Sequence, residues 1–390
     1  MMIALRPHQQ NAVYAMRQNA IGQIIVPTGG GKTLVAIMDA AKRFEVNVPR
    51  TIVVVAPRIL LAEQLCSEFM EHIDNVNVMH VHSGETHYFR TTKPERIKLA
   101  NLMCHTVGEH NIIFTTYHSL HRIQESGIDV DTIYFDEAHN SVQRNFYPAT
   151  EYFSKKADRT FYFTATRKTS VTDNKPGMNW SDTYGQVIAR VSAPELVQGG
   201  YICPPKVKVL ELDKNIPVTP ENEAKHLIDT LDDINKDKVL VCVKTTRQLT
   251  NIFKTDFASE LTHRGYHYLY ITSATGAVID GQKVGREEFF ETLNTWGKDS
   301  TKRFVILHRS ILSEGISVNG LEAAVFLRNM DGIELLQSVG RVIRTSPNKT
   351  YGLCVVPVYS KVGIATQKSL QRAVDIVFEQ GDMYDSVARR

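Results

Sequence analysis

Short apolar runs rich in β-branched residues alternate along this chain with longer segments in which apolar residues recur at helical spacing. Continuous apolar runs of about four to six residues are typical of strands buried on both faces, as in a mostly parallel sheet flanked by helices. The pattern therefore indicates the α/β class. Strands are predicted at 23–26, 51–56, 111–115, 132–135 and 160–163, and in a second series at 238–243, 268–272, 303–307, 323–327 and 352–356.

The two series of strands predict two α/β domains. Between them, the glycines and prolines of Gln198–Pro205 are typical of a linker or hinge. We therefore expect a first domain over residues 1–200 and a second over residues 201–390. The chain is expected to end in a helix over 364–378 and a polar tail.

Composition and charge add modest limits. A formal net charge of +3 neither requires nor excludes a nucleic-acid partner, because a basic groove can form within a balanced total. The five cysteines lie far apart without a Cys-x-x-Cys pair, which is typical of a reduced intracellular protein and indicates neither zinc nor disulfides. No signal-like N-terminus or membrane-spanning stretch is apparent in the sequence, so we expect a soluble, cytoplasmic protein.

A glycine-rich segment, Val-Pro-Thr-Gly-Gly-Gly-Lys-Thr at 26–33, lies between a predicted strand and a predicted helix. Consecutive glycines allow several backbone N–H groups to point into one concavity, and the helix adds its positive N-terminal end. Such a concavity suits a polyphosphate, and the alternative is a glycine-rich turn without a ligand. The backbone groups expected to bind phosphate belong to Thr28, Gly29, Gly30 and Gly31.

The two residues that follow these glycines suggest the rest of the nucleotide site. Lys32 would reach the β- and γ-phosphates of ATP, and the Thr33 hydroxyl would ligate Mg²⁺. Pro27 stands where the general pattern has its first glycine, so that glycine is missing here.

Two carboxylates follow the predicted strand at 132–135 directly. Asp136 and Glu137 would emerge at the carboxyl end of that strand, the edge where ligands bind in open parallel sheets. Asp136 is placed to hold Mg²⁺, and Glu137 to polarise the attacking water. A surface acidic pair is the alternative.

Further short strings accompany these two motifs in a fixed order. They are LRPHQ at 5–9, VVAPR at 54–58, TTYHS at 115–119, DEAH at 136–139, TAT at 164–166, VKTT at 243–246, SEGISV at 313–318 and QSVGRVIR at 337–344. With them the chain resembles a superfamily 2 helicase or translocase of the DEAH type over nearly its whole length. The resemblance implies two tandem RecA-like domains with ATP and Mg²⁺ bound in the cleft between them.

The resemblance also implies roles for residues beside the phosphate loop. Arg6 and Gln9 belong to the adenine-recognition segment, in which Gln9 would bond the base edge, and Gly315 of the fifth motif would contribute to nucleotide binding. Residues implied to couple nucleotide state to the other domain are His139, Thr164 and Thr166.

Other matched positions are implied to grip a nucleic-acid backbone. They are Pro57, Arg58, Thr116 and Tyr117 in the first domain and Lys244 and Thr245 in the second. For Pro57 and Arg58, the alternative is that they only cap a strand.

The sixth motif supplies the positive charge that the first domain lacks opposite the γ-phosphate. Arg341 and Arg344 lie three residues apart and would share one face of a predicted helix, with Gln337 completing the pattern. In the family the second arginine is the usual finger, so we expect Arg344 to act on the transition state and Arg341 to contact phosphate or the DEAH motif. A solvated basic helix face is the alternative.

The sequence departs from the family pattern at two places. Ser317 stands where the fifth motif commonly has Asp, which puts its coupling role in doubt, and three glycines replace the more frequent Gly-x-Gly in the phosphate loop.

Family-level similarity favours DNA as the track. The phosphate loop and the junction at 196–205 resemble phage and bacterial DNA helicases and restriction-enzyme motors, whereas an RNA-specific DEAD-box protein would have Asp in place of His139. We expect a monomer whose specificity comes from a protein partner or from short insertions. Open alternatives are a double-stranded DNA translocase that does not separate strands, an RNA helicase, and a module in which ATP only gates nucleic-acid binding.

Three histidines lie close together in the sequence between residues 80 and 87. His80, His82 and His87 have neither an accompanying cysteine nor helical i, i+4 spacing, so we interpret them as part of a solvated loop and not as metal ligands.

Overall fold

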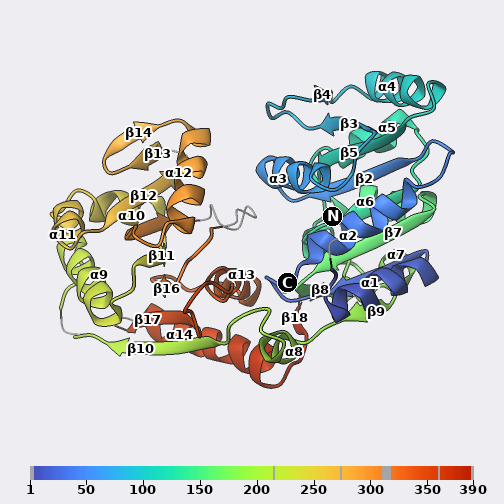
Figure 1. The fold of residues 1–390 in the computed structure, drawn as a ribbon. Coiled ribbons are helices and arrows are strands. Elements are labelled where there is room, and N and C mark those ends of the chain that lie inside the picture. Colours follow the sequence, from blue (N-terminus) through green and yellow to red (C-terminus); the bar gives the residue numbers. More distant parts are fainter. Residues whose placement is uncertain (1–3, 214–215, 273–274, 310–317, 359–360, 388–390) are drawn as a thin grey trace. The chain divides into compact units, whose positions relative to one another are not determined.

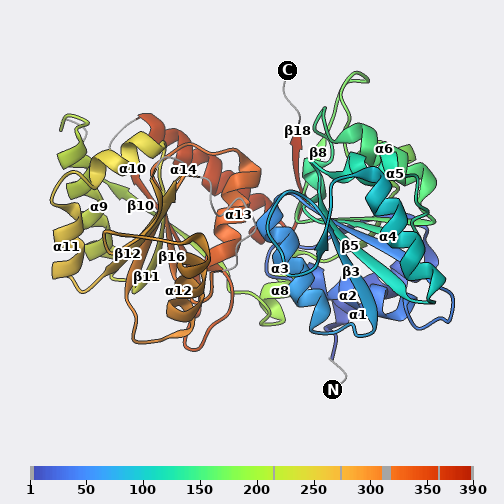
Figure 2. The same ribbon diagram turned by 90° about the horizontal axis from the view of Figure 1, so that it is seen from above.

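The computed structural model describes residues 4–213, 216–272, 275–309, 318–358 and 361–387. The chain divides into two compact units: unit 1 comprises Met1–Ser192 and Met383–Arg390, and unit 2 comprises Ala193–Asp382. Each unit is built around one large sheet with helices on both faces (Figures 1 and 2). The division precedes α8 (Ala193–Gln198), shortly before the sequence boundary expected at 200/201.

In unit 1 the described residues form an eight-stranded parallel sheet in the order β4-β3-β5-β2-β6-β7-β1-β9. The strands are β1 (Ile21–Ile25), β2 (Thr51–Ala56), β3 (Val76–Val81), β4 (Phe89–Arg90), β5 (His110–Thr116), β6 (Thr132–Phe135), β7 (Arg159–Thr164) and β9 (Val187–Arg190). Because all of them run in one direction, their carboxyl ends share one edge, where ligands bind in open α/β sheets.

Helices cover both faces of this sheet. Helices α1 (Pro7–Gln18), α2 (Lys32–Arg43) and α3 (Ile59–Met70) cover one face, and α4 (Pro94–Thr106), α5 (Leu120–Ser126) and α6 (Tyr147–Lys156) cover the other (Figure 2). Every residue of β2 is buried, and its side chains alternate between the two faces. Val53 and Val55 contribute to the core beneath α4, α5 and α6.

The end of the chain adds a short two-stranded sheet to unit 1. β18 (Tyr384–Val387) pairs in parallel with β8 (Thr166–Thr169), and Arg167 forms an ion pair with Asp385 at 2.6 Å. Part of the expected polar tail thus forms a strand at 384–387, although it has no apolar run, because backbone pairing and this ion pair hold it.

Unit 2 has, within its described residues, a sheet in the order β10-β17-β16-β11-β15-β12-β13-β14. The strands are β10 (Pro205–Glu211), β11 (Lys238–Cys242), β12 (His267–Thr272), β13 (Gly276–Ile279), β14 (Gln282–Val284), β15 (Phe304–His308), β16 (Ala323–Phe326) and β17 (Gly352–Val358). The pairings of β12 with β13 and of β13 with β14 are antiparallel, and the others are parallel.

Two groups of helices bury the faces of the second sheet. α9 (Pro220–Ile234), α10 (Thr246–Ile252) and α11 (Phe257–His263) pack on one face, where Leu231, Leu249 and Phe257 join the core. α12 (Arg286–Lys298), α13 (Gly332–Val342) and α14 (Lys361–Val374) cover the other face (Figure 2). A π-helical turn, η3 (Asp375–Glu379), continues α14.

All of the strands that the apolar runs predicted are present in the two sheets, and the α/β class with two RecA-like sheets is confirmed. The strands that the pattern missed lie mainly at sheet edges. β10 alternates lysines with apolar residues because it is only partly covered. The β13–β14 hairpin turns at Asp280 and Gly281, both at positive φ (46° and 83°), which suits a two-residue turn.

Candidate nucleotide and nucleic-acid site

The glycine-rich segment forms a tight loop between β1 and α2, at the carboxyl edge of the unit 1 sheet. Gly29 and Gly31 have φ values of 87° and 82°, in the left-handed region that favours glycine. A Cβ atom on Gly31 would lie 2.4 Å from the side-chain nitrogen of Gln9. The loop leads directly into Lys32, the first residue of α2, so the N-terminal end of a twelve-residue helix faces the loop.

The start of α1 holds this loop from behind. Gln9 is buried; its Nε2 donates to the Gly31 carbonyl at 3.1 Å, and its Oε1 accepts from the Arg6 backbone N–H at 2.9 Å. His8 Nε2 lies 2.7 Å from the Gly30 carbonyl. The structure thus brings Arg6 and Gln9 to the phosphate loop, while the bond from Gln9 to an adenine stays a prediction. No role for His8 was predicted from the sequence. Its position next to Gln9 is the feature that could have indicated a contact with the phosphate loop.

Lys32 and Glu137 form an ion pair across the sheet edge. Lys32 Nζ lies 3.3 Å from Glu137 Oε1, and both side chains are largely buried. Glu137 has a φ of 45°, which is unusual for a residue with a side chain. This conformation turns the chain immediately after β6, so that Glu137 faces the phosphate loop.

Asp136 shares a small recess with Lys32 and Thr33. Burial, with the charge of Glu137 next, raises the pKa of Asp136. Two neighbouring carboxylates therefore face one lysine, a surplus of negative charge that a divalent cation would compensate. The carboxylate of Asp136 and the hydroxyl of Thr33 are oxygen donors of the kind that Mg²⁺ prefers, so these residues fit the cation.

His139 connects the DEAH segment to the end of β7. Its Nδ1 lies 3.1 Å from Thr164 Oγ1 and 3.5 Å from Glu137 Oε2. Thr164 Oγ1 donates to the Thr166 carbonyl at 2.6 Å. The three residues implied to couple nucleotide state to the rest of the molecule therefore form one chain of contacts that begins at Glu137.

The segments implied to bind nucleic acid differ in exposure. Arg58 is exposed at the N-terminus of α3, and Pro57 is half-buried beside it. Thr116 and Tyr117 are buried, and the Tyr117 hydroxyl donates to the Asp136 carbonyl at 2.8 Å. Because both side chains lie in the core of unit 1, a nucleic-acid contact at these two positions would have to come from the backbone, and the contact stays a prediction.

In unit 2 the fourth motif ends on the exposed residues Lys244 and Thr245. Thr245 caps α10, since its hydroxyl accepts from the Gln248 N–H at 3.0 Å. Gln248 also accepts from the Lys244 backbone N–H, at 2.7 Å. The lysine side chain is thus presented from a rigid helix start.

The sixth motif spans the end of α13. Gln337 and Arg341 lie on this helix, which ends at Val342, whereas Arg344 forms an extended bridge with Ile202. The expectation that both arginines share a helical face is therefore wrong: the chain leaves the helix at Ile343 to pair with the segment that precedes β10.

Several positive charges gather around the buried side chain of His308 at the end of β15. Burial, with the charges of Arg328 and Arg341 next, lowers the pKa of His308 to about 3. Arg341 is itself almost fully buried. Positive charge from arginines is thus concentrated at this edge of the unit 2 sheet. Gly315 and Ser317 of the fifth motif lie outside the described residues.

His80 and His82 do not lie in a solvated loop, so that interpretation is wrong for them. His80 is on β3 and His82 follows it, and both side chains are buried, whereas His87 is exposed. Both approach Glu63 of α3. Burial lowers the pKa of His80 to about 4. The apolar residues of β3 were too few to predict this strand.

Comparison with known proteins agrees with this arrangement. A model of the family described as Type III restriction enzyme, res subunit, matches residues 2–169. A protein of Sulfolobus islandicus filamentous virus (isolate Iceland/Hveragerdi) named "Putative helicase 22" is 24% identical, and the match covers 91% of this chain and 64% of that protein. The chain thus spans less than two thirds of the length of this relative.

Solved structures show the same fold. The ATP-dependent Type ISP restriction-modification enzyme LlaBIII bound to DNA matches with a TM-score of 0.76 and 18% identity, over 100% of this chain and 31% of the enzyme. Mss116p bound to ssRNA and AMP-PNP matches with a TM-score of 0.63 and 14% identity, over 100% of this chain and 75% of that protein.

Within the described parts of the chain, we find no helix with the length and apolar character needed to cross a bilayer. The phosphate loop, the DEAH segment and the arginine-bearing segment lie at the ends of strands or helices in two sheets of the RecA type. Together with the family match, the viral helicase relative and the shared fold, this means that the chain contains a superfamily 2 helicase-like core.

Proposed function

We propose that this chain is an ATP-dependent helicase or translocase that acts on DNA and hydrolyses ATP with Mg²⁺ between its two RecA-like units. The observation that carries the proposal is the ion pair between Lys32 and Glu137, beside Asp136. A phosphate-binding lysine, a potential base and a potential Mg²⁺ ligand thus converge at the end of one parallel sheet. A surface acidic pair would not be half-buried against the lysine of a glycine loop.

The chain's own groups divide the hydrolysis reaction among them. Backbone N–H groups of the loop bind the β- and γ-phosphates, and Lys32 exchanges Glu137 for phosphate when ATP binds. Glu137, freed from the lysine, then orients the attacking water and accepts its proton. Asp136 and Thr33 hold Mg²⁺, which offsets the charge of the phosphates.

Unit 2 contributes positive charge to the same reaction. Arg344 stabilises charge on the transferred phosphoryl group as an arginine finger, and Arg341 contacts phosphate or the DEAH segment. The contacts from Glu137 through His139 to Thr164 and Thr166 support a route by which the state of the nucleotide reaches the rest of the core.

DNA is favoured as the track because LlaBIII, whose fold this chain shares, was solved bound to DNA and belongs to the restriction enzymes, as does the matching family. RNA is the second candidate, since Mss116p was solved with ssRNA. Contacts with phosphates, from Arg58 in unit 1 and from Lys244 in unit 2, would hold a strand without reading its sequence. Specificity would then come from a protein partner.

The test is steady-state ATPase activity at one fixed salt concentration, without polymer and with single-stranded DNA, duplex DNA or RNA. We expect strong stimulation by DNA that is abolished by Lys32→Ala. Lys42→Ala is the matched control, because Lys42 lies exposed on the same helix and contacts Glu45. Stimulation by RNA alone would overturn DNA as the track, and a strand-displacement assay separates unwinding from translocation.

Glu137→Gln tests the assigned base. It should bind ATP with Mg²⁺ but lose about 10²–10⁴-fold in turnover, the range for a positioned general base. Glu125→Gln, an exposed carboxylate variant, should leave turnover unchanged. Normal turnover in Glu137→Gln would refute the mechanism, and a wild-type protein that binds ATP without any stimulated turnover would indicate a gated binding module.

A further inference from the structure

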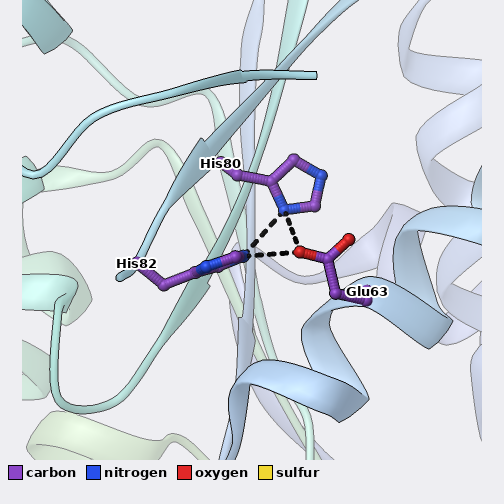
Figure 3. Close-up of side chains that lie close together, drawn as sticks. All are labelled: Glu63, His80 and His82. Atoms are coloured by element: carbon purple, nitrogen blue, oxygen red, sulfur yellow. Dashed lines mark hydrogen bonds and ion pairs between the residues drawn. The ribbon is translucent and has the colours of Figure 1, made fainter. Parts of the chain in front are cut away.

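A cluster of three buried or half-buried side chains lies at the end of β3 in unit 1 (Figure 3). In the sheet, β3 is separated by β5, β2, β6 and β7 from β1, the strand that leads into the glycine loop. Glu63 projects from α3, His80 from β3, and His82 from the residue after this strand. The two imidazoles are 0% and 1% exposed, and the carboxylate side chain is 29% exposed. None of the proposed steps of ATP hydrolysis uses these residues.

The three side chains present their ligand atoms to one point. His80 Nδ1 lies 2.9 Å from His82 Nε2 and 3.5 Å from Glu63 Oε1, and His82 Nε2 lies 3.1 Å from Glu63 Oε1. Zinc binds imidazole nitrogen at about 2.0–2.1 Å and carboxylate oxygen at about 2.0–2.2 Å, so two ligands of a tetrahedral ion stand about 3.3–3.5 Å apart. A slight opening of the two imidazoles would fit the ion.

The composition of the cluster also favours an ion. Two neutral imidazoles and one carboxylate carry a net negative charge that faces a largely buried space. Glu63 Oε1, the atom that both imidazoles approach, is buried without a hydrogen-bond partner among the described residues. Hydrogen bonding thus leaves the centre of this polar cluster partly unsatisfied, which is costly in a protein interior.

The donor set points to a particular class of metal. Two nitrogens and one carboxylate oxygen suit Zn²⁺ or another late divalent transition ion, whereas Mg²⁺ prefers oxygen ligands alone. Three protein ligands leave a fourth position for water. The partly exposed Glu63 provides the side of the cluster that solvent can reach.

Occupancy would involve the loop after β3. The Gly84 N–H donates to His82 Nδ1 at 3.2 Å, which places the ring proton of a neutral His82 on Nε2. Coordination through Nε2 moves this proton to Nδ1, so the Gly84 N–H has to turn away. Metal binding is therefore expected to change the conformation of residues 83–84.

We propose that Glu63, His80 and His82 bind one divalent transition-metal ion, Zn²⁺ in particular, which links α3 to the end of β3. Because α3 begins directly after Arg58, the ion would fix the helix start that presents this residue. The site is separate from the Mg²⁺ position at Asp136 and Thr33 and does not depend on the proposed function.

The test uses the full chain without an affinity tag, freed of metal by a chelator and assayed without nucleotide. Titration with Zn²⁺ should show one equivalent bound and a raised unfolding temperature, and Co²⁺ should give the visible spectrum of a tetrahedral nitrogen–oxygen site. Glu63→Gln and His82→Gln should weaken Zn²⁺ binding by more than about 100-fold, since losing a group that only orients a ligand already costs about 10–100-fold.

Matched controls separate this site from other parts of the surface. Glu71→Gln and His72→Gln change exposed residues just beyond α3 and should bind Zn²⁺ as the wild type does. Asp136→Asn should also retain Zn²⁺ binding. Glu63→Gln carries the test even where loss of a buried histidine prevents folding, because Glu63 is partly exposed. Absence of a zinc equivalent in the wild type, or full zinc binding by Glu63→Gln, would overturn the proposal.

Discussion

Replacing Gly31 with Ala tests how α1 holds the phosphate loop. Gly31 combines a φ of 82° with a close neighbour, since its added Cβ would lie 2.4 Å from Gln9 Nε2. That neighbour is the end of a side chain, so the clash is relieved when Gln9 rotates away. Rotation breaks the bonds from Gln9 to the Gly31 carbonyl and from the Arg6 N–H to Gln9.

The cost of the substitution has two parts. A non-glycine residue in the left-handed region costs about 1–2 kcal/mol, of which about 0.4–1 kcal/mol is recovered because alanine restricts the unfolded chain. Loss of two hydrogen bonds at about 1 kcal/mol each adds about 2 kcal/mol. Gly127 has a φ of 64° with no atom within 4 Å of its added Cβ, so Gly127→Ala carries only the first part.

Calorimetry without nucleotide measures the difference. A further loss of about 2 kcal/mol should place the unfolding temperature of Gly31→Ala about 4–8 °C below that of Gly127→Ala. Adding Gln9→Ala should remove the extra penalty, so that the two changes are not additive. Equal unfolding temperatures for the two glycine variants would refute the proposed role of Gln9.

Three other predictions address stability and binding. Asp39→Asn should lower the free energy of unfolding by about 3–5 kcal/mol, because Arg159, 2.9 Å from both carboxylate oxygens, stays buried without its counter-charge. Urea unfolding measures this loss. The surface control Glu125→Gln should lower the free energy of unfolding by less than about 1 kcal/mol. The pKa of His308 is lowered to about 3 in the folded protein, below its value in the unfolded chain, so stability present at pH 7 is lost as pH falls from about 6.5 towards 3. In His308→Gln, the free energy of unfolding should depend less on pH over that range. An unchanged pH profile in this variant would contradict the role of His308. Arg58→Ala should reduce the slope of log DNA affinity against log salt concentration by about one, whereas Arg17→Ala, a change at an exposed residue, should leave the slope unchanged. Fluorescence anisotropy measures these slopes. Equal slopes for the Arg58→Ala variant and the wild type would exclude a phosphate contact at Arg58.

The sequence predicted those elements that a pattern of neighbouring residues is enough to identify. β2 and β6 are short, mostly apolar runs with no polar face, which is typical of strands buried on both faces. Edge strands such as β10 gave no comparable signal, because exposure allows lysines between their apolar residues. β3 was missed because part of its buried surface is polar: His80 is fully buried, and its burial depends on Glu63 from a helix distant in sequence.

The sequence by itself determined the two mostly parallel sheets, the glycine loop before α2, and the two carboxylates at the end of β6, because apolar runs and motif spacing can be recognised in consecutive residues. Only the tertiary structure decided which side chains meet. It paired Lys32 with Glu137, placed Tyr117 in the core, took Arg344 off its helix and gathered Glu63 with His80 and His82. The reason is that each of these outcomes depends on the packing of segments far apart in sequence, and the pattern of neighbouring residues does not specify which distant segments pack together.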